Sequence, residues 1–161
     1  MLVLGIDPGT AITGYALVTE RGAETVAIAY GVITTPSDRA LPDRLVMIYR
    51  ELGAILERYQ PDHAAVEQLF FNTNVRTALA VGHARGVVML TLAQAHVRIF
   101  EYTPLAVKLA ITGSGRADKR QMQQMVRLLL SLDQIPKPDD AADALAIALC
   151  HLHSARMTML E

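Results

Sequence analysis

The sequence predicts an α/β domain in which a five-stranded mixed sheet is flanked by helices. Three observations lead to this prediction. Three strand-like segments follow one another at the start of the chain, strands and helices then alternate, and the end of the chain is helical. The length of 161 residues suits one compact domain with a substantial core. We expect residues 1–153 to form this domain and residues 154–161 to form a short tail.

The first three strands are expected at Leu2–Asp7, Gly14–Thr19 and Thr25–Thr34. The first is an apolar run that ends at Asp-Pro-Gly, a sequence typical of a buried strand followed by a turn. Because the turns between the three segments are short, the strands should form an antiparallel meander. Two further strands are expected at Ala64–Glu67 and Val97–Tyr102, each after a helical segment.

Helices are expected between and after these strands. Asp38–Tyr59 has apolar residues at helical spacing and is closed by a proline. Val75–Ala95 is apolar on nearly all sides, which predicts a buried helix. Three more helices are expected at Pro104–Ile111, Lys119–Leu130 and Asp139–His151. This order fits the RNase H-like fold and does not fit the strict strand–helix alternation of a Rossmann domain.

The charge distribution, the cysteine content and the hydrophobic runs indicate which classes of protein the chain fits. Fifteen basic and sixteen acidic residues nearly cancel, but six basic and only two acidic residues lie between Arg98 and Arg127. That segment is compatible with phosphate binding, although a solvated helix face would have the same composition. The single cysteine, Cys150, excludes an intrachain disulfide, and His151 and His153 are expected to be surface groups. With neither a signal peptide nor a membrane-spanning run, we expect a soluble cytoplasmic protein.

Four acidic residues lie where predicted elements end or begin. Asp7 and Glu67 each end a strand, and Asp140 and Asp143 open the last helix on one face. Carboxylates gathered in a partly buried site repel one another, and Mg2+ or Mn2+ would remove that conflict. Two ions about 4 Å apart can activate a water and stabilise the leaving oxygen of a phosphodiester. In this hypothesis Asp7 bridges both ions, Glu67 and Asp143 hold one each, and Asp140 completes the set or orients the attacking water.

Each acid also has a structural interpretation. Asp7 would serve as a turn aspartate within Asp-Pro-Gly. Glu67 would form a salt bridge with a nearby arginine such as Arg76. Asp140 would be the N-cap of the last helix, with Asp143 completing a capping box. The catalytic interpretation is favoured because all four acids fall at the ends of elements that would be neighbours in one sheet.

Several motifs, taken in order, resemble the RuvC family of bacterial Holliday junction resolvases. They are Gly5-Ile6-Asp7-Pro8-Gly9-Thr10 with Thr13-Gly14-Tyr15, Glu67-Gln68-Leu69-Phe70, Ala84-Arg85-Gly86-Val87, and Asp140 through Ala148. Each motif is moderately specific, and their order and spacing together are highly specific. The resemblance implies an RNase H-like fold, a homodimer, and Mg2+-dependent symmetric cuts in a four-way DNA junction. It also implies the branch-migration motor RuvA and RuvB as partners.

The resemblance assigns roles to individual residues. The catalytic acids of the family fall on Asp7, Glu67, Asp140 and Asp143, and the third of these is a histidine in some members. The aromatic residue implicated in stacking on junction bases falls on Phe70. Further candidates for DNA contact lie in the same loop or in the basic segment: Asn72, Asn74, Lys108, Arg116 and Lys119.

The symmetry of the junction also favours a homodimer, because two matched nicks need two identical sites. We expect the helix around Ala78–Ala95 to form much of the interface. The sequence also bears on three rival functions. An actin/Hsp70-type ATPase needs two lobes, and this chain supplies one. A non-catalytic binding module would lose acids that are present here. The remaining alternative is an RNase H-like nuclease that acts on structured RNA.

Overall fold

The computed structural model describes residues 1–68 and 75–159, with side chains described as far as residue 155. The strands are β1 (Val3–Asp7), β2 (Ile12–Arg21), β3 (Glu24–Thr34), β4 (His63–Glu67) and β5 (Arg98–Tyr102). The helices are α1 (Leu41–Tyr59), α2 (Val75–Gln94), α3 (Pro104–Thr112), α4 (Lys119–Leu129) and α5 (Asp139–Met159). The order of strands and helices is the one that the sequence predicts.

The five strands form one mixed sheet in the order β3-β2-β1-β4-β5. β1 pairs with β2, and β2 with β3, in antiparallel fashion, as the short turns predict. β1 and β4 are parallel, with Ile6 opposite Val66, and β4 and β5 are also parallel. Because parallel neighbours end at the same edge of a sheet, Asp7 and Glu67 come out side by side.

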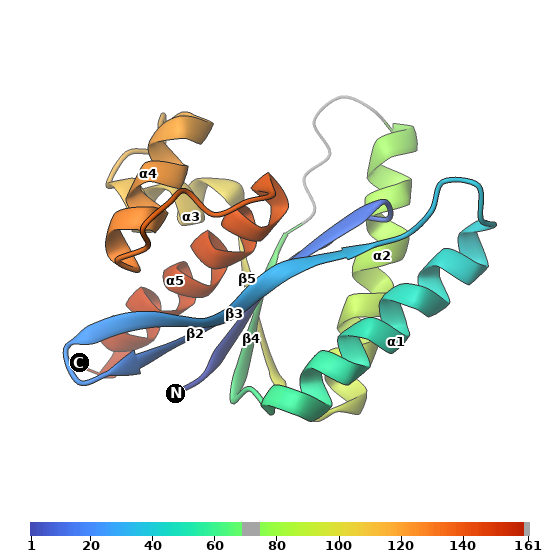
Figure 1. Ribbon diagram of the computed structural model, residues 1–161, viewed down its shortest axis with the longest axis horizontal. Helices are drawn as coiled ribbons and strands as arrows, with labels where there is room; N and C mark the ends of the chain where they lie inside the picture. Colours follow the sequence, from blue (N-terminus) through green and yellow to red (C-terminus); the bar gives the residue numbers. More distant parts are fainter. Residues whose placement is uncertain (69–74, 160–161) are drawn as a thin grey trace.

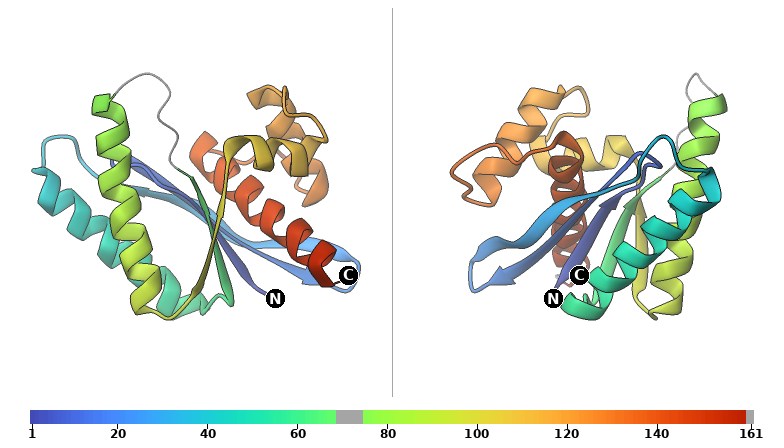
Figure 2. Two further views of the ribbon diagram at one scale, coloured as in Figure 1. Left: turned by 180° about the vertical axis from the view of Figure 1, so that it is seen from behind. Right: turned by 45° about the vertical axis from the view of Figure 1, so that its right-hand side comes forward.

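Helices cover both faces of the sheet (Figures 1 and 2). α1 and α2 pack on one face, and α5 packs on the other with α3 and α4 beside it. The alternation of side chains along β1 divides the core accordingly, because Leu4 and Ile6 join the α1–α2 side and Val3 joins the α5 side. Gly5 lets α5 lie directly on β1, since a Cβ atom there would overlap the backbone of Ala144.

Three expectations about the helices need correction or extension. α2 is not buried all round, because Val75, Leu79 and Leu90 expose 74%, 59% and 55% of their area. His151 is not a surface group, since only 2% of it is exposed. α5 extends to Met159, so the boundary predicted at residue 153 falls inside a helix. Among the helices in the described part of the chain, none has the length and apolar character that crossing a bilayer requires.

Candidate active site

The four predicted acids come from three neighbouring elements. Asp7 ends β1 and Glu67 ends β4, while Asp140 and Asp143 lie in the first turns of α5. Gly14 lies opposite Asp7 in the β1–β2 pair. This glycine allows the start of α5, with Asp140 and Asp143, to approach the sheet edge that holds Asp7 and Glu67. A Cβ atom at Gly14 would overlap the carbonyl oxygen of Asp140, so the start of α5 rests on the strand beside Asp7. The sheet edge and the helix start therefore form one acidic site.

Burial and neighbouring negative charges disfavour the ionised forms of the carboxylates in this site. Burial raises the pKa of Asp7 to about 7, and the negative charges of Glu67, Asp143 and Asp140 add to the shift, while Lys119 opposes it. Burial, followed by the charge of Asp143, also raises the pKa of Glu67. Burial likewise raises the pKa of Asp143, against the lowering effect of Lys119. Carboxylates whose ionised forms are disfavoured in this way provide a site for a cation.

A hollow of about 210 Å³ opens beside the acids. Glu67 and Asp143 line it from β4 and α5, and Lys108 and Lys119 line it from α3 and α4. Met122 contributes an apolar wall. The hollow therefore brings two carboxylates and two cationic side chains together, an arrangement that suits both a metal ion and a phosphate.

Lys119 is tied to the acidic site by ion pairs. Its Nζ lies 2.9 Å from Asp139 Oδ2 and 3.9 Å from Asp143 Oδ2. Gln123 Nε2 donates a hydrogen bond of 2.9 Å to Asp139 Oδ1. The capping box of Asp118 fixes the start of α4 at Lys119. The sequence assigned no role to Asp139, and the only signal for it was its position four residues before Asp143, on the same side of the helix.

Arg85 supports the end of β4. Its Nε donates to the carbonyl oxygen of Glu67 at 3.4 Å, and its guanidinium forms an ion pair with Glu101. The backbone N–H of Gln68 donates to the carbonyl oxygen of Tyr102 at 2.8 Å. The β4 and β5 backbones therefore stay paired up to the acidic edge of the sheet, where β4 ends at Glu67.

The predicted DNA contacts fall into three groups. Lys108 and Lys119 meet in the hollow. Arg116 is exposed in the connection between α3 and α4 and does not line the hollow. The remaining candidates lie outside the described residues: Phe70, Asn72 and Asn74.

Asp140 is not an N-cap. α5 begins at Asp139, and the carbonyl oxygen of Pro138 accepts from the N–H groups of Ala141 and Ala142. Asp140 therefore lies inside the first turn, and the interpretation of this residue as a capping group is wrong.

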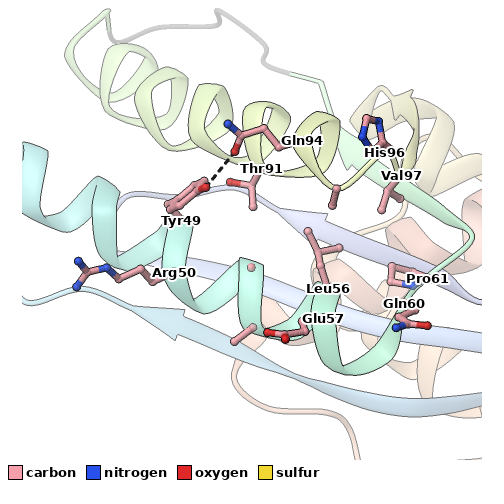
Figure 3. A pocket seen from close by; sticks show the side chains of 13 residues that line it. Tyr49, Arg50, Leu56, Glu57, Gln60, Pro61, Thr91, Gln94, His96 and Val97 are labelled. Carbon is pink, nitrogen blue, oxygen red and sulfur yellow. Dashed lines mark hydrogen bonds between the residues drawn. The ribbon is translucent and has the colours of Figure 1, made fainter.

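A larger hollow, of about 770 Å³, lies away from the acids (Figure 3). It is formed by α1 and α2 and by the chain that leads from them into the starts of β4 and β5. Tyr49 and Gln94 face each other across it through a hydrogen bond of 3.0 Å. Glu57 is the only carboxylate among its lining residues, so this hollow does not gather carboxylates as the acidic site does. Size therefore does not identify the active site here.

The comparisons agree on one family. The family described as "Crossover junction endodeoxyribonuclease RuvC" matches residues 3–151. The chain belongs to the RuvC family. It is 58% identical to the crossover junction endodeoxyribonuclease of Alkaliphilus oremlandii (strain OhILAs), covering 98% of this chain and 96% of the relative. It is 57% identical to that of Chloroflexus aggregans (strain MD-66 / DSM 9485), covering 96% and 94% of the two chains.

Solved structures give the same result. The Thermus thermophilus RuvC in complex with a Holliday junction substrate superposes with a TM-score of 0.93 at 37% identity, covering 98% of this chain and 96% of that chain. The yeast mitochondrial Holliday junction resolvase, at 16% identity and a TM-score of 0.70, covers 98% and 82% of the two chains and shares the fold. The predicted RNase H-like fold and the predicted family are both confirmed.

Proposed function

We propose that this chain is a metal-dependent endodeoxyribonuclease that resolves Holliday junctions by paired symmetric nicks in DNA recombination and repair. The observation that carries the proposal is the gathering of four carboxylates and two lysines where β1 and β4 end and α5 begins. Its relatives are named as crossover junction endodeoxyribonucleases, and the similar Thermus protein was solved with a junction substrate. These findings support the same reaction here.

The donor set fits a hard divalent cation. In the described part of the chain, no three His, Cys, Asp or Glu side chains stand ready to hold one ion together. Burial raises the pKa of Asp7, and the charges of Glu67, Asp143 and Asp140 raise it further, so a bound cation would stabilise the ionised carboxylates. We therefore assign Asp7, Glu67, Asp140 and Asp143 to two Mg2+ ions, with Mn2+ able to substitute. Such ions supply water activation and stabilise the leaving oxygen.

The other residues of the site would hold the DNA. Lys108 and Lys119 place two positive charges where a backbone phosphate would enter the hollow. Phe70 would stack on an unpaired base at the crossover, an interaction that contributes about 1–3 kcal/mol per base. Asn72, Asn74 and Arg116 would contact the flanking backbone. The reaction would take place in the cytoplasm, together with the branch-migration motor RuvA and RuvB.

Two symmetric nicks require two sites, and α2 is suited to join two copies of the chain. Leu79, Gly86 and Leu90 share one exposed side of this helix. A glycine inside a helix costs about 1 kcal/mol relative to alanine. At Gly86 a Cβ atom would meet nothing within 4 Å among the described residues, so packing inside one chain does not require glycine there. A second helix lying close against Gly86 would explain it.

Sedimentation velocity tests the dimer. At micromolar concentration we expect the wild type to sediment as a dimer and Leu90→Asp to sediment as a monomer, because a charge on the apolar face prevents its burial. Leu128→Asp on α4 is the matched control, since Leu128 is 58% exposed and Leu90 55%. A monomeric wild type, or equal behaviour of the two variants, contradicts the proposed interface.

Cleavage of synthetic DNA tests the function. The purified protein is incubated with a mobile four-way junction and with a linear duplex of the same sequence, in Mg2+, in Mn2+ and in EDTA. We expect paired nicks in the junction that require the metal, with the duplex left intact. Indifference to both DNAs, together with cleavage of a structured RNA, would replace the proposal with the alternative of an RNase H-like ribonuclease.

A further inference from the structure

Asp139 makes two contacts with α4, and both of its oxygens are used. Oδ2 lies 2.9 Å from Lys119 Nζ, and Oδ1 accepts a hydrogen bond of 2.9 Å from Gln123 Nε2. Lys119 and Gln123 are one helical turn apart, so they lie on the same side of α4. A carboxylate held at both oxygens has a fixed orientation, and the ammonium that it binds is fixed with it.

Folding stability does not account for this arrangement. The side chains of Lys119 and Asp139 are each 56% exposed, and exposed ion pairs contribute little to stability. Lys119 is also the first residue of α4, where the positive end of the helix dipole disfavours a cation. The carboxylate of Asp139 offsets that disadvantage and keeps the ammonium at a position that it would otherwise avoid.

The position of the Lys119 ammonium matters because Asp143 lies next to it. Lys119 Nζ is 3.9 Å from Asp143 Oδ2, within electrostatic range but 1.0 Å farther than from Asp139. Asp143 therefore makes only the longer of the two contacts with the ammonium, which also lines the hollow with Lys108. Without Asp139 the ammonium would move into solvent or onto Asp143 itself, where it would compete with the metal.

We propose that Asp139 is a positioning residue that keeps the Lys119 ammonium at the rim of the carboxylate site. This inference rests on the proposed nuclease function, since the rim is where a phosphate would be held. Asp139 acts through Lys119, so it needs no contact with DNA or metal, and its effect should vanish when Lys119 is absent.

The test compares Asp139→Asn with Asp133→Asn, a matched loss of one exposed carboxylate that lies outside this cluster. On a four-way junction in Mg2+ we expect Asp139→Asn to lower kcat about fivefold with KM nearly unchanged, because the charge is misplaced in the transition state. In a Lys119→Ala background the same substitution should change kcat no further. Asp133→Asn should match the wild type in both backgrounds.

A second readout needs neither metal nor DNA. The rate at which acetic anhydride acetylates Lys119, relative to the Met1 amine, is measured by mass spectrometry in EDTA. We expect faster acetylation in Asp139→Asn than in Asp133→Asn, because the amine loses its hydrogen-bond partner. An equal rate in the two variants overturns the inference, and so does an effect on kcat that adds to that of Lys119→Ala. If the wild type fails to cut the junction, the proposed function fails, and the acetylation rates still decide whether Asp139 holds Lys119.

Discussion

The two ends of helix α5 bury polar groups in opposite ways. At its start, Asp140 and Asp143 join Asp7 and Glu67, and the charges of these carboxylates act against one another. Near its end, the buried ring of His151 has a partner for each nitrogen. At the start, the carboxylates keep an electrostatic repulsion that a bound cation can relieve. At the His151 ring, both nitrogens have hydrogen-bond partners among the described residues. Burial of a polar group therefore indicates function only where its partners fail to satisfy it.

The histidine end is a short chain of hydrogen bonds between β5, α5 and β4. His151 Nδ1 lies 2.8 Å from the Tyr102 hydroxyl, and His151 Nε2 lies 2.8 Å from His63 Nδ1. A neutral imidazole has one donor and one acceptor, so His151 donates to one of these two partners and accepts from the other, and its tautomer sets which. The Phe100 ring packs on His151 with centroids 4.3 Å apart. Burial, with the charge of His63 adding, lowers the pKa of His151 to about 4, so the ring is neutral at pH 7.

The largest effect is expected from Asp7→Asn, at the acidic end. Losing the central ligand should lower the rate of junction cleavage in Mg2+ at least about a thousandfold while junction binding stays near normal. Removing one of the repelling charges should also stabilise the protein, by about 1 kcal/mol in EDTA. Cleavage assays, gel shifts and urea unfolding measure the three quantities. Normal cleavage by Asp7→Asn would overturn the assignment of the active site.

The next largest effect is expected from His151→Ala, at the histidine end. The substitution leaves a cavity and removes the partner of both Tyr102 and His63, so the free energy of unfolding should fall by about 3 kcal/mol. Cleavage by the folded fraction should stay within about twofold of the wild type, because this end takes no part in the chemistry. Urea unfolding and cleavage below the unfolding midpoint test the pair of outcomes. A His151→Ala variant that is stable but cleaves poorly would mean that His151 serves the reaction and not the stability of the fold.

The acidic end was predictable from the sequence because local signals mark each of its residues. Asp7 and Glu67 stop apolar runs, and Asp140 and Asp143 open a segment of strong helical propensity. The parallel pairing of β1 with β4 then places Asp7 beside Glu67, and this pairing follows from the order of strands and helices along the chain. The contact of Asp139 with Lys119 was not predictable, because it depends on how α4 docks against α5.

The burial of His151 was missed for a different reason. Its partners come from β4 and β5, far away in sequence, and the residues around it read as a polar helix end. Ala144, Ile147, Ala148 and His151 follow one another at helical spacing and are all buried. The spacing of the apolar residues therefore could have predicted that His151 is buried. The sequence of α2 gave no such signal. Because apolar residues occur on all sides of this helix, their spacing does not show which side is exposed.

The smallest effect is a pH dependence of stability that has opposite signs at the two ends. The pKa of His151 falls from 6.5 unfolded to about 4 folded, so the unfolded chain binds more protons in that window and stability is lost as the pH falls. The pKa of Asp7 rises from 3.8 to about 7, so the folded chain binds more protons there and stability is lost as the pH rises. In the metal-free wild type the two slopes oppose each other between pH 6.5 and about 4.

Asp7→Asn should therefore expose the contribution of His151. Urea unfolding of this variant in EDTA should show a loss of about 2 kcal/mol between pH 6.5 and 4, steeper than in the wild type. Adding His151→Gln should remove the contribution of His151, because the glutamine side chain can hydrogen-bond but does not titrate. The raised pKa values of Glu67 and Asp143 remain in both variants, so the difference between the two curves isolates His151. A wild type and an Asp7→Asn variant with parallel curves would mean that the two ends of α5 do not differ in the way their charges are held.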